Sequence, residues 1–109
     1  MMVGRIHEVT LGNLSELLRR GKPVVVDFWA GWCAPCHAMA PIMKSLAKEF
    51  DEQITFAKVD VPNNRDLAEQ FKIRSLPTVV LFKNGEEWDR FNGLKGKSDI
   101  RNLLQKLSK

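Results

Sequence analysis

Apolar residues along this chain follow two spacings, one typical of strands and one typical of helices. Residues 24–29 form a run of apolar and β-branched side chains interrupted only by Asp27, as expected for a central strand covered on both faces. Shorter runs of the same kind predict strands at residues 3–9, 54–59 and 78–82. Asn84 and Gly85 then form a strong hairpin signal, so residues 86–91 should return antiparallel beside the preceding strand.

Between these strands, apolar residues recur at the three- and four-residue spacing of amphipathic helices. The longest such segment covers residues 33–50, and we expect Pro41 to kink it because proline removes a helical hydrogen bond. A first helix should begin after Asn13, and a short one should cover residues 66–71. Ser98 resembles the cap of a last helix, whose apolar stripe consists of Ile100, Leu103, Leu104 and Leu107.

The resulting order of elements is β-α-β-α-β-α-β-β-α. Strands that alternate with helices pair in parallel through crossovers, whereas the closing hairpin must be antiparallel. We therefore predict an α/β fold with a central mixed five-stranded sheet between two helical layers, a three-layer α/β/α arrangement. The 109 residues, of which 44% are apolar, suit one domain over residues 1–109 with no linker.

Charged residues are spread along the chain. The net charge is +4, and Arg19, Arg20 and Lys22 form a small basic cluster, but most other basic residues are interleaved with acids. We therefore expect a solvated surface and no nucleic-acid partner. No apolar segment is long enough for a membrane span, and the first residues lack the pattern of an export signal. The expected location is the cytoplasm, with no membrane association.

The two cysteines, Cys33 and Cys36, lie three residues apart where a helix should begin directly after the central strand. This spacing puts both side chains on one face of the first helical turn, at disulfide-bonding distance. Unpaired backbone N–H groups and the positive end of the helix dipole favour a thiolate there, so Cys33 should be the nucleophile and Cys36 the resolving thiol. Pro35 fits because the first turn needs no N–H from it.

Three other interpretations of the cysteine pair remain open at this point. A zinc site would need about four ligands, and His7 and His37 are the only histidines available to complete one. The five residues from Cys33 to His37 also fit the pattern for covalent attachment of a c-type haem, which would require export and a haem pocket. The third interpretation is a pair of inert core thiols.

Asp27 is the one ionisable residue within the apolar run of the central strand. Desolvation should raise its pKa toward neutrality, which suits a proton carrier beside reacting thiols. The alternative is an aspartate at the end of a strand that points to water. Three apolar residues before it and two after it favour burial.

The stretch Phe28-Trp29-Ala30-Gly31-Trp32-Cys33-Ala34-Pro35-Cys36 resembles the active-site segment of the thioredoxin family. The likeness covers nearly the whole chain. Further positions that match the family are Asp27, Pro41, Lys58, Pro77 and Gly93. The resemblance implies a thioredoxin fold and a protein-disulfide reductase with no bound cofactor besides its own redox-active disulfide. It implies protein substrates that contain disulfides, and electrons from a separate reductase of the thioredoxin-reductase type. We expect a monomer.

The resemblance also implies where substrates bind. It places a cis-proline at Pro77, facing the cysteines. The backbone of Leu76, the residue before it, would pair with the substrate chain, and Thr78, the residue after it, is also expected to bind substrate. Gly93 resembles the family's groove glycine, where a partner backbone approaches closely. The expected substrate-binding residues beside the cysteines are Trp32, Ala34 and Pro35.

By the same resemblance, Asp27 lies beneath the disulfide and takes the proton of Cys36, and Lys58 lies near Asp27 and offsets part of the cost of burying it. Two alternative functions remain open. One is a disulfide oxidase or isomerase, which differs from a reductase in reduction potential rather than in any motif. The other is a docking subunit that uses the same groove without redox chemistry.

The chain departs from the family pattern at three positions near the cysteines. Ala34 stands where the family usually has glycine, and His37 where it has lysine or arginine. Both changes can shift the redox poise, because residues beside the cysteines set how strongly a thiolate is stabilised. Asn92 stands where an aliphatic residue is common, so the docking surface should be less apolar.

Overall fold

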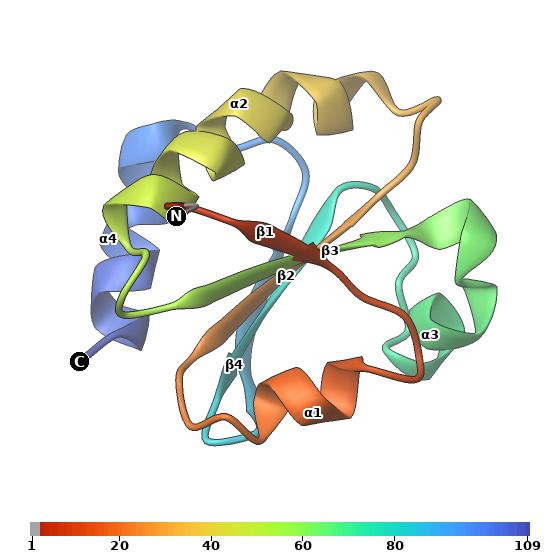
Figure 1. Cartoon of the computed structure of the whole chain (residues 1–109). Helices are drawn as coiled ribbons and strands as arrows, with labels where there is room; N and C mark the ends of the chain where they lie inside the picture. Colours follow the sequence, from red (N-terminus) through yellow and green to blue (C-terminus); the bar gives the residue numbers. More distant parts are fainter. Residues whose placement is uncertain (1–2) are drawn as a thin grey trace.

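The computed structural model describes residues 3–109 and contains one five-stranded sheet with helices on both faces (Figure 1). The strands are β1 (Ile6–Glu8), β2 (Val24–Trp29), β3 (Thr55–Asp60), β4 (Thr78–Lys83) and β5 (Glu86–Asn92). The helices are α1 (Leu14–Leu18), α2 (Ala34–Glu49), α3 (Arg65–Gln70) and α4 (Lys97–Leu107), with a 3-10 turn, η1 (Val61–Asn63), before α3. The predicted order of strands and α-helices is confirmed.

The sheet has the strand order β1-β3-β2-β4-β5. β1 and β2 each pair with β3 in parallel, and β4 pairs antiparallel with both β2 and β5. β2 therefore lies at the centre, as its apolar run predicted. In this register Asp27 of β2 lies beside Lys58 of β3 and Val79 of β4.

Two hydrophobic layers hold the helices against the sheet. On one face the helices α2 and α4 pack through buried residues that include Met39, Leu46, Ile100 and Leu104. On the other face α1 and α3 pack through residues that include Leu14, Leu17 and Leu67. β2 supplies both layers, because Val25 points to the first and its neighbours Val24 and Val26 to the second. This is the predicted three-layer arrangement.

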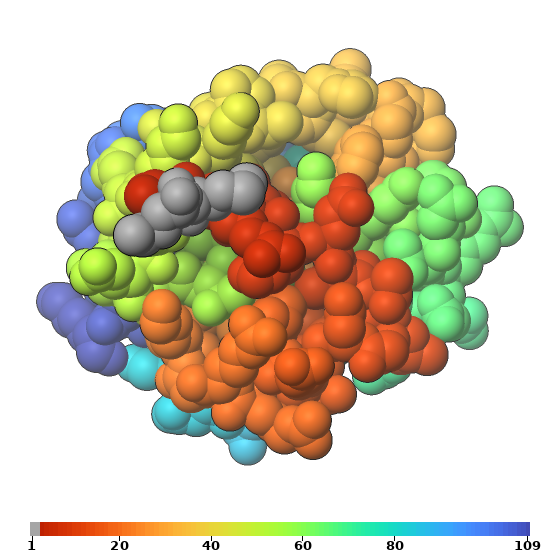
Figure 2. Space-filling view, viewed as in Figure 1, coloured from red at the N-terminus to blue at the C-terminus, as the bar shows by residue number. Residues whose placement is uncertain are grey.

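β1 is shorter than the strand predicted over residues 3–9. Gly4 has a φ of +76°, which lies outside the strand region, and its N–H donates to Oδ1 of Asp51 at 2.9 Å rather than to a neighbouring strand. β1 forms one edge of the sheet, and this part of the chain lies at the surface between α1 and α2 (Figure 2). The prediction was right about the strand and wrong about its length.

The start of α4 also differs from the prediction, because Ser98 does not cap it. Gly96 is the N-cap, with extended backbone angles (φ −68°, ψ 154°), and its carbonyl accepts the N–H of Ile100 at 3.1 Å. This bond closes the first turn earlier, so that Ser98 lies inside the helix. In α2 the helix continues on both sides of Pro41, and the kink expected there stays a prediction.

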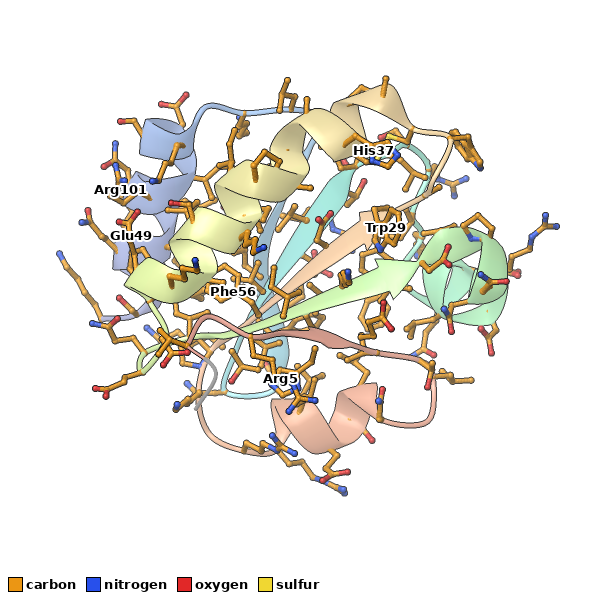
Figure 3. All side chains as sticks on the ribbon, turned by 45° about the horizontal axis from the view of Figure 1, so that its top comes forward. Arg5, Trp29, His37, Glu49, Phe56 and Arg101 are labelled. Atoms are coloured by element: carbon orange, nitrogen blue, oxygen red, sulfur yellow. A yellow bond between two sulfur atoms is a disulfide. The ribbon has the colours of Figure 1, made fainter. Side chains whose placement is uncertain are left out.

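An exposed ionic cluster joins α2 to α4 (Figure 3). Glu49 accepts two hydrogen bonds from the guanidinium of Arg101, at 2.8 and 3.0 Å, and its carboxylate lies 3.2 Å from Nζ of Lys97. The hydrogen bonds from Arg101, together with the Lys97 ammonium, lower the pKa of Glu49 to about 2. The cluster connects the two helices on their solvent side.

Candidate active site

The two cysteines lie where the chain leaves the central strand and enters α2. Cys33 is the N-cap of α2 and forms a disulfide with Cys36, with their Cα atoms 5.3 Å apart. The backbone N–H of Cys36 donates to Sγ of Cys33 at 3.2 Å. Both residues are almost completely buried, with 5% and 4% of their surface exposed. The disulfide expected from the spacing is therefore present.

The local backbone explains why these sulfurs are suited to redox chemistry. The N–H of Cys33 donates to the carbonyl of Ala30 at 3.2 Å, which turns the chain from β2 toward the helix. Pro35 lies in the first turn, where its missing N–H costs nothing. The free N–H groups and the positive end of the helix dipole favour a sulfur that carries negative charge. The position of Cys33 therefore favours its thiolate form.

Three segments that are distant in sequence meet beside the disulfide. Leu76 packs against the buried cluster formed by Cys33, Cys36 and Ala30. The peptide bond between Leu76 and Pro77 is cis, as the resemblance implied. The carbonyl of Pro77 accepts the N–H of Gly93 at 2.8 Å, so the loop before β4 is held against the end of β5.

The surface beside the disulfide is open at two of the predicted binding residues. Gly93 has a φ of +80°, and within residues 3–109 no atom outside Gly93 and its two chain neighbours lies within 4 Å of where a Cβ would be. Trp32 exposes 76% of its surface next to the buried Cys33. An exposed aromatic ring can pack against a bound peptide, and a glycine with free space above it allows a peptide backbone to approach closely.

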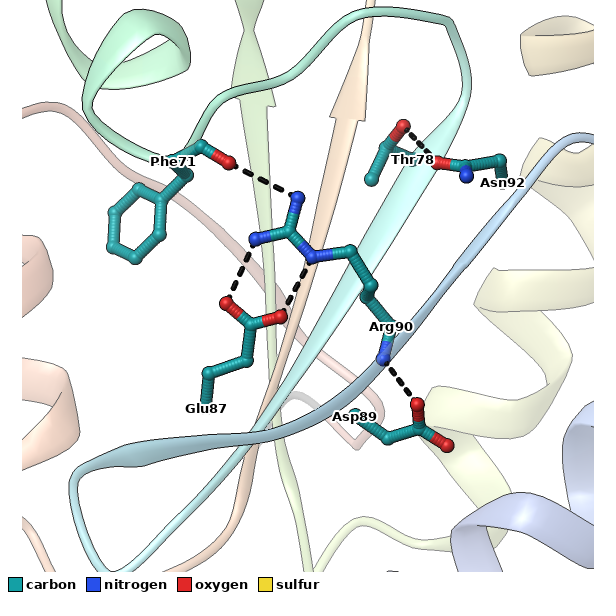
Figure 4. Close-up of polar contacts among 6 residues, drawn as sticks. All are labelled: Phe71, Thr78, Glu87, Asp89, Arg90 and Asn92. Carbon is teal, nitrogen blue, oxygen red and sulfur yellow. Dashed lines mark hydrogen bonds and ion pairs between the residues drawn. The ribbon is translucent and has the colours of Figure 1, made fainter.

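Asn92 contacts Thr78, which the sequence analysis did not predict. The buried hydroxyl of Thr78 lies 2.8 Å from Oδ1 of Asn92 (Figure 4). It also lies 2.7 Å from the carbonyl of Ser75, so its one hydrogen is shared between two acceptors. The contact with Asn92 joins the start of β4 to the end of β5, next to Gly93. Asn92 is exposed, so it adds a polar group to that edge of the surface.

Asp27 and Cys36 line the same cavity, which has a volume of about 310 Å³. Within residues 3–109, Oδ1 of Asp27 is buried and has no hydrogen-bond partner. Burial raises the pKa of Asp27 to about 6, and the positive charge of Lys58 opposes part of that rise. Near neutral pH this carboxyl is therefore able to accept and to release a proton, in agreement with its place in the apolar run.

Lys58 has two further neighbours besides Asp27. Its Nζ lies 3.8 Å from Oε1 of Glu8 and 5.5 Å from the centre of the Trp29 ring. Among the described residues no ion pair or hydrogen bond joins Lys58 to Asp27, so its charge acts on the carboxyl through space. Sequence reasoning missed Glu8, because only the pairing of β1 with β3 brings it opposite Lys58.

His37 holds the loop that precedes the cysteines. Its Nε2 lies 2.6 Å from the carbonyl of Gly31, and its ring meets the edge of Trp29 with the centroids 6.4 Å apart (Figure 3). Because a carbonyl only accepts hydrogen bonds, Nε2 carries the hydrogen in this arrangement. His37 also lines the cavity that contains Asp27. The spacing of the motif did not reveal this contact.

The structure offers no support for the zinc interpretation. In the part of the chain from residue 3 to residue 109, no three His, Cys, Asp or Glu side chains are grouped so that they would hold a metal ion. A separate observation is that no helix among these residues has both the length and the apolar character to cross a membrane.

Comparison with known sequences gives consistent matches. The family model for thioredoxin matches residues 5–106. The thioredoxin of Mycobacterium tuberculosis strain H37Rv is 44% identical over 94 residues, which are 86% of this chain and 78% of the relative. The thioredoxin of Rickettsia typhi is 35% identical over 105 residues, or 96% and 98% of the two chains. The bifunctional thioredoxin reductase/thioredoxin of Mycobacterium leprae is 44% identical over 86 residues, which are 79% of this chain but 19% of that longer protein.

A solved structure agrees with these relatives. The thioredoxin of Malassezia sympodialis superimposes with a TM-score of 0.91 at 29% identity, over 100% of this chain and 96% of that chain. The agreement extends through the sheet and helices that position the disulfide. The chain therefore belongs to the thioredoxin family, has the thioredoxin fold, and is a thiol-disulfide oxidoreductase that reduces protein disulfides by dithiol-disulfide exchange.

Proposed function

We propose that Cys33 attacks the substrate disulfide and that Cys36 resolves the product. The Cys33 thiolate forms a mixed disulfide with one substrate sulfur and releases the other as a thiolate. Cys36 then attacks Sγ of Cys33, which forms the Cys33–Cys36 disulfide and releases the second substrate thiolate. The observation that carries this assignment is the N–H of Cys36 donating to Sγ of Cys33 at the start of α2. A hydrogen-bond donor aimed at that sulfur stabilises its negative charge.

Asp27 is proposed to accept the proton of Cys36 when Cys36 resolves the mixed disulfide. Both residues line one cavity, and a pKa of about 6 makes the Asp27 carboxyl an effective base near neutral pH. The proton passes from Sγ of Cys36 to the carboxylate, directly or through water in the cavity. Lys58 limits the rise of the Asp27 pKa and so keeps a larger fraction of the carboxyl ionised.

The substrate is proposed to lie along the surface between Trp32 and Gly93. The exposed ring of Trp32 and the open space above Gly93 support this placement. The remaining residues of this surface are Ala34, Pro35, Leu76, Pro77 and Thr78. A substrate segment in extended form would bring its disulfide to Cys33, with Leu76 and Pro77 beside it.

The wider role is proposed from the family. Oxidised protein would be returned to the dithiol by a separate reductase of the thioredoxin-reductase type, and the name of the Mycobacterium leprae relative joins these two activities. We further propose that the protein acts as a monomer in the cytoplasm, with no cofactor besides its own disulfide.

Trapping the intermediate tests the order of the two cysteines. Cys36→Ser should accumulate a mixed disulfide between Cys33 and a protein substrate, detected by mass spectrometry, because the resolving thiol is missing. Cys33→Ser should accumulate none, and the doubly substituted protein serves as the control. Equal trapping by the two single variants would contradict the assigned roles.

The midpoint potential tests whether the protein runs as a reductase. Thiol alkylation in dithiothreitol and glutathione buffers should give one two-electron transition below the cytosolic glutathione poise. A midpoint well above that poise would instead indicate an oxidase or isomerase.

A further inference from the structure

A basic cleft lies at the end of the sheet opposite to the disulfide. Its volume is about 220 Å³, and its polar lining consists of Arg5, His7, Arg20, Lys22, Asp51 and Thr55. The parallel strands β1, β2 and β3 begin at this end, whereas the disulfide follows the last residue of β2. Figure 3 shows Arg5 near the start of these strands, away from Trp29 and His37. The cleft is therefore separate from the active site.

The alternation of the edge strand builds one wall of this cleft. Ile6 packs into the hydrophobic layer formed with α2, so its strand neighbour His7 points to the opposite face. Arg5, which directly precedes β1, lines the same cleft as His7. α1 ends at Leu18, and the chain continues through Arg20 and Lys22 before β2 begins. Basic residues from two separate segments thus meet at one cleft.

The cleft carries more positive than negative charge. Arg5, Arg20 and Lys22 face a single carboxylate, that of Asp51, whose Oδ1 already accepts the N–H of Gly4. Within residues 3–109, Arg5 and Lys22 form no ion pair, and the partner of Arg20 is an exposed Glu16 at 3.5 Å. Exposed pairs of this kind contribute little energy, so these cations remain available to a ligand.

His7 reports the electrostatic character of the cleft. Burial lowers the pKa of the His7 imidazole, and the positive charges of Arg5 and Arg20 lower it further. Both effects favour the neutral form of His7. A bound anion would offset the two arginines, so its arrival would favour protonation of His7 and add another cation to the site.

We propose that this cleft binds a tetrahedral dianion, the phosphate group of a small phosphorylated ligand or free inorganic phosphate. Guanidinium groups present N–H donors in a planar fork that matches two oxygens of such an anion. Arg5 and Arg20 supply two forks from different segments, Lys22 adds a point charge, and Thr55 adds a hydroxyl. A carboxylate, with one charge and two oxygens, would engage fewer of these groups.

Sulfate is the probe of choice, because it keeps both charges across the pH range in which histidine titrates. The imidazole protons of the wild-type protein are followed by NMR as a function of pH, with sodium sulfate or with sodium chloride of equal ionic strength. The pKa of His7 should rise in sulfate, whereas the imidazole proton signals of His37, the other histidine of the chain, should be the same in the two salts. Equal behaviour of the two histidines would overturn the proposal.

Substitutions distinguish a built site from general attraction to a basic protein. Arg5→Ala with Arg20→Ala should weaken sulfate binding at least about tenfold, because two charge-assisted contacts are lost. Arg65→Ala with Arg74→Ala is the charge-matched control, since these arginines line another surface cleft, and it should bind as the wild type does. Equal weakening by both pairs would overturn the proposal.

Inorganic phosphate and O-phosphoserine are then compared: tighter binding of O-phosphoserine supports a phosphorylated ligand, and equal binding supports free phosphate.

Discussion

Asp27 shows how burial determines the chemistry of a single residue. The unfolded carboxyl ionises near pH 3.8, whereas burial, opposed in part by Lys58, raises the folded pKa to about 6. The folded state therefore binds the proton more tightly, and folding becomes less favourable as the pH rises between these two values. Above pH 6 the cost is constant, at about 2 to 3 kcal/mol. The proposed proton acceptor is thus obtained at the expense of stability.

Asp27→Asn should separate these two effects. Near neutral pH the variant should be more stable by about 2 kcal/mol, and the gain should disappear below about pH 4, where Asp27 is protonated in both states. Guanidinium denaturation at the two pH values measures this. The variant should also reduce protein disulfides more slowly, because Cys36 loses its proposed proton acceptor. A stability gain of the same size at both pH values would show that packing, and not the buried charge, accounts for it.

At the scale of helices, the exposed carboxylate of Glu49 adds an ionic contact to the hydrophobic packing between α2 and α4. The hydrogen bonds from Arg101 and the charge of Lys97 lower its pKa from 4.5 to about 2. Because the folded pKa lies below the unfolded one, the stabilisation is fully present above about pH 4.5 and is lost as the pH falls toward 2. The cluster therefore contributes to the stability of the join between α2 and α4 near neutral pH and not in strong acid.

Glu49→Gln should lower the thermal midpoint near neutral pH, because both cationic partners lose their anion. The difference from the wild type should shrink as the pH falls toward about 2, where Glu49 itself becomes protonated. Thermal unfolding followed by circular dichroism across this range measures the effect. Glu52→Gln is the control, because Glu52 is exposed and its carboxylate forms no hydrogen bond within residues 3–109. It should leave the thermal midpoint unchanged at both ends of this pH range.

At the scale of strands, Arg90 anchors the edge strand β5 to the end of α3. Its guanidinium donates to both carboxylate oxygens of Glu87, at 2.6 and 2.7 Å, and to the carbonyl of Phe71 at 3.0 Å (Figure 4). Arg90→Lys keeps the charge but not the fork, and should destabilise the protein by about 1 kcal/mol. Amide hydrogen exchange should become faster in β5. Arg74→Lys is the control, and an equal change there would contradict the role of the fork.

At the scale of the whole molecule, the surface around the disulfide is assembled from segments that are far apart in sequence. Gly93 lies at the end of β5, Leu76 and Pro77 before β4, and the cysteines at the start of α2. The bond from the N–H of Gly93 to the carbonyl of Pro77 joins two of these segments. Substrate binding should therefore respond to changes that leave the cysteines untouched.

Gly93→Ala should raise KM for a protein substrate while changing kcat little, because the added Cβ projects into open space on the proposed substrate surface. Gly21→Ala is a matched control: Gly21 has a φ of +89° and also has open space, but it lies in the turn between α1 and β2. Both variants should lose about 1 kcal/mol of stability, because an alanine is strained at positive φ. A KM that rises equally in both would show that strain, and not the groove, is responsible.

Local patterns in the sequence predicted most of the elements correctly, because hydrophobic spacing and turn residues act within a few positions. The boundaries of β2 were obtained from its apolar run, and the hairpin from Asn84 and Gly85. Boundaries were wrong where a tertiary contact competed, as when Asp51 draws the N–H of Gly4 away from a strand. The 3-10 turn η1 was missed because three residues carry too little periodicity.

By itself the sequence determined the redox pair, because the spacing of Cys33 and Cys36 and the helix start after β2 are local properties. It also indicated the buried carboxyl of Asp27, since an unbroken apolar run on either side implies burial. Only the tertiary structure decided which groups act on these residues. Glu8 and Trp29 reach Lys58, Asn92 reaches Thr78, and the basic residues of two segments line one cleft. Such contacts depend on strand pairing and side-chain direction between distant segments, which local spacing does not specify.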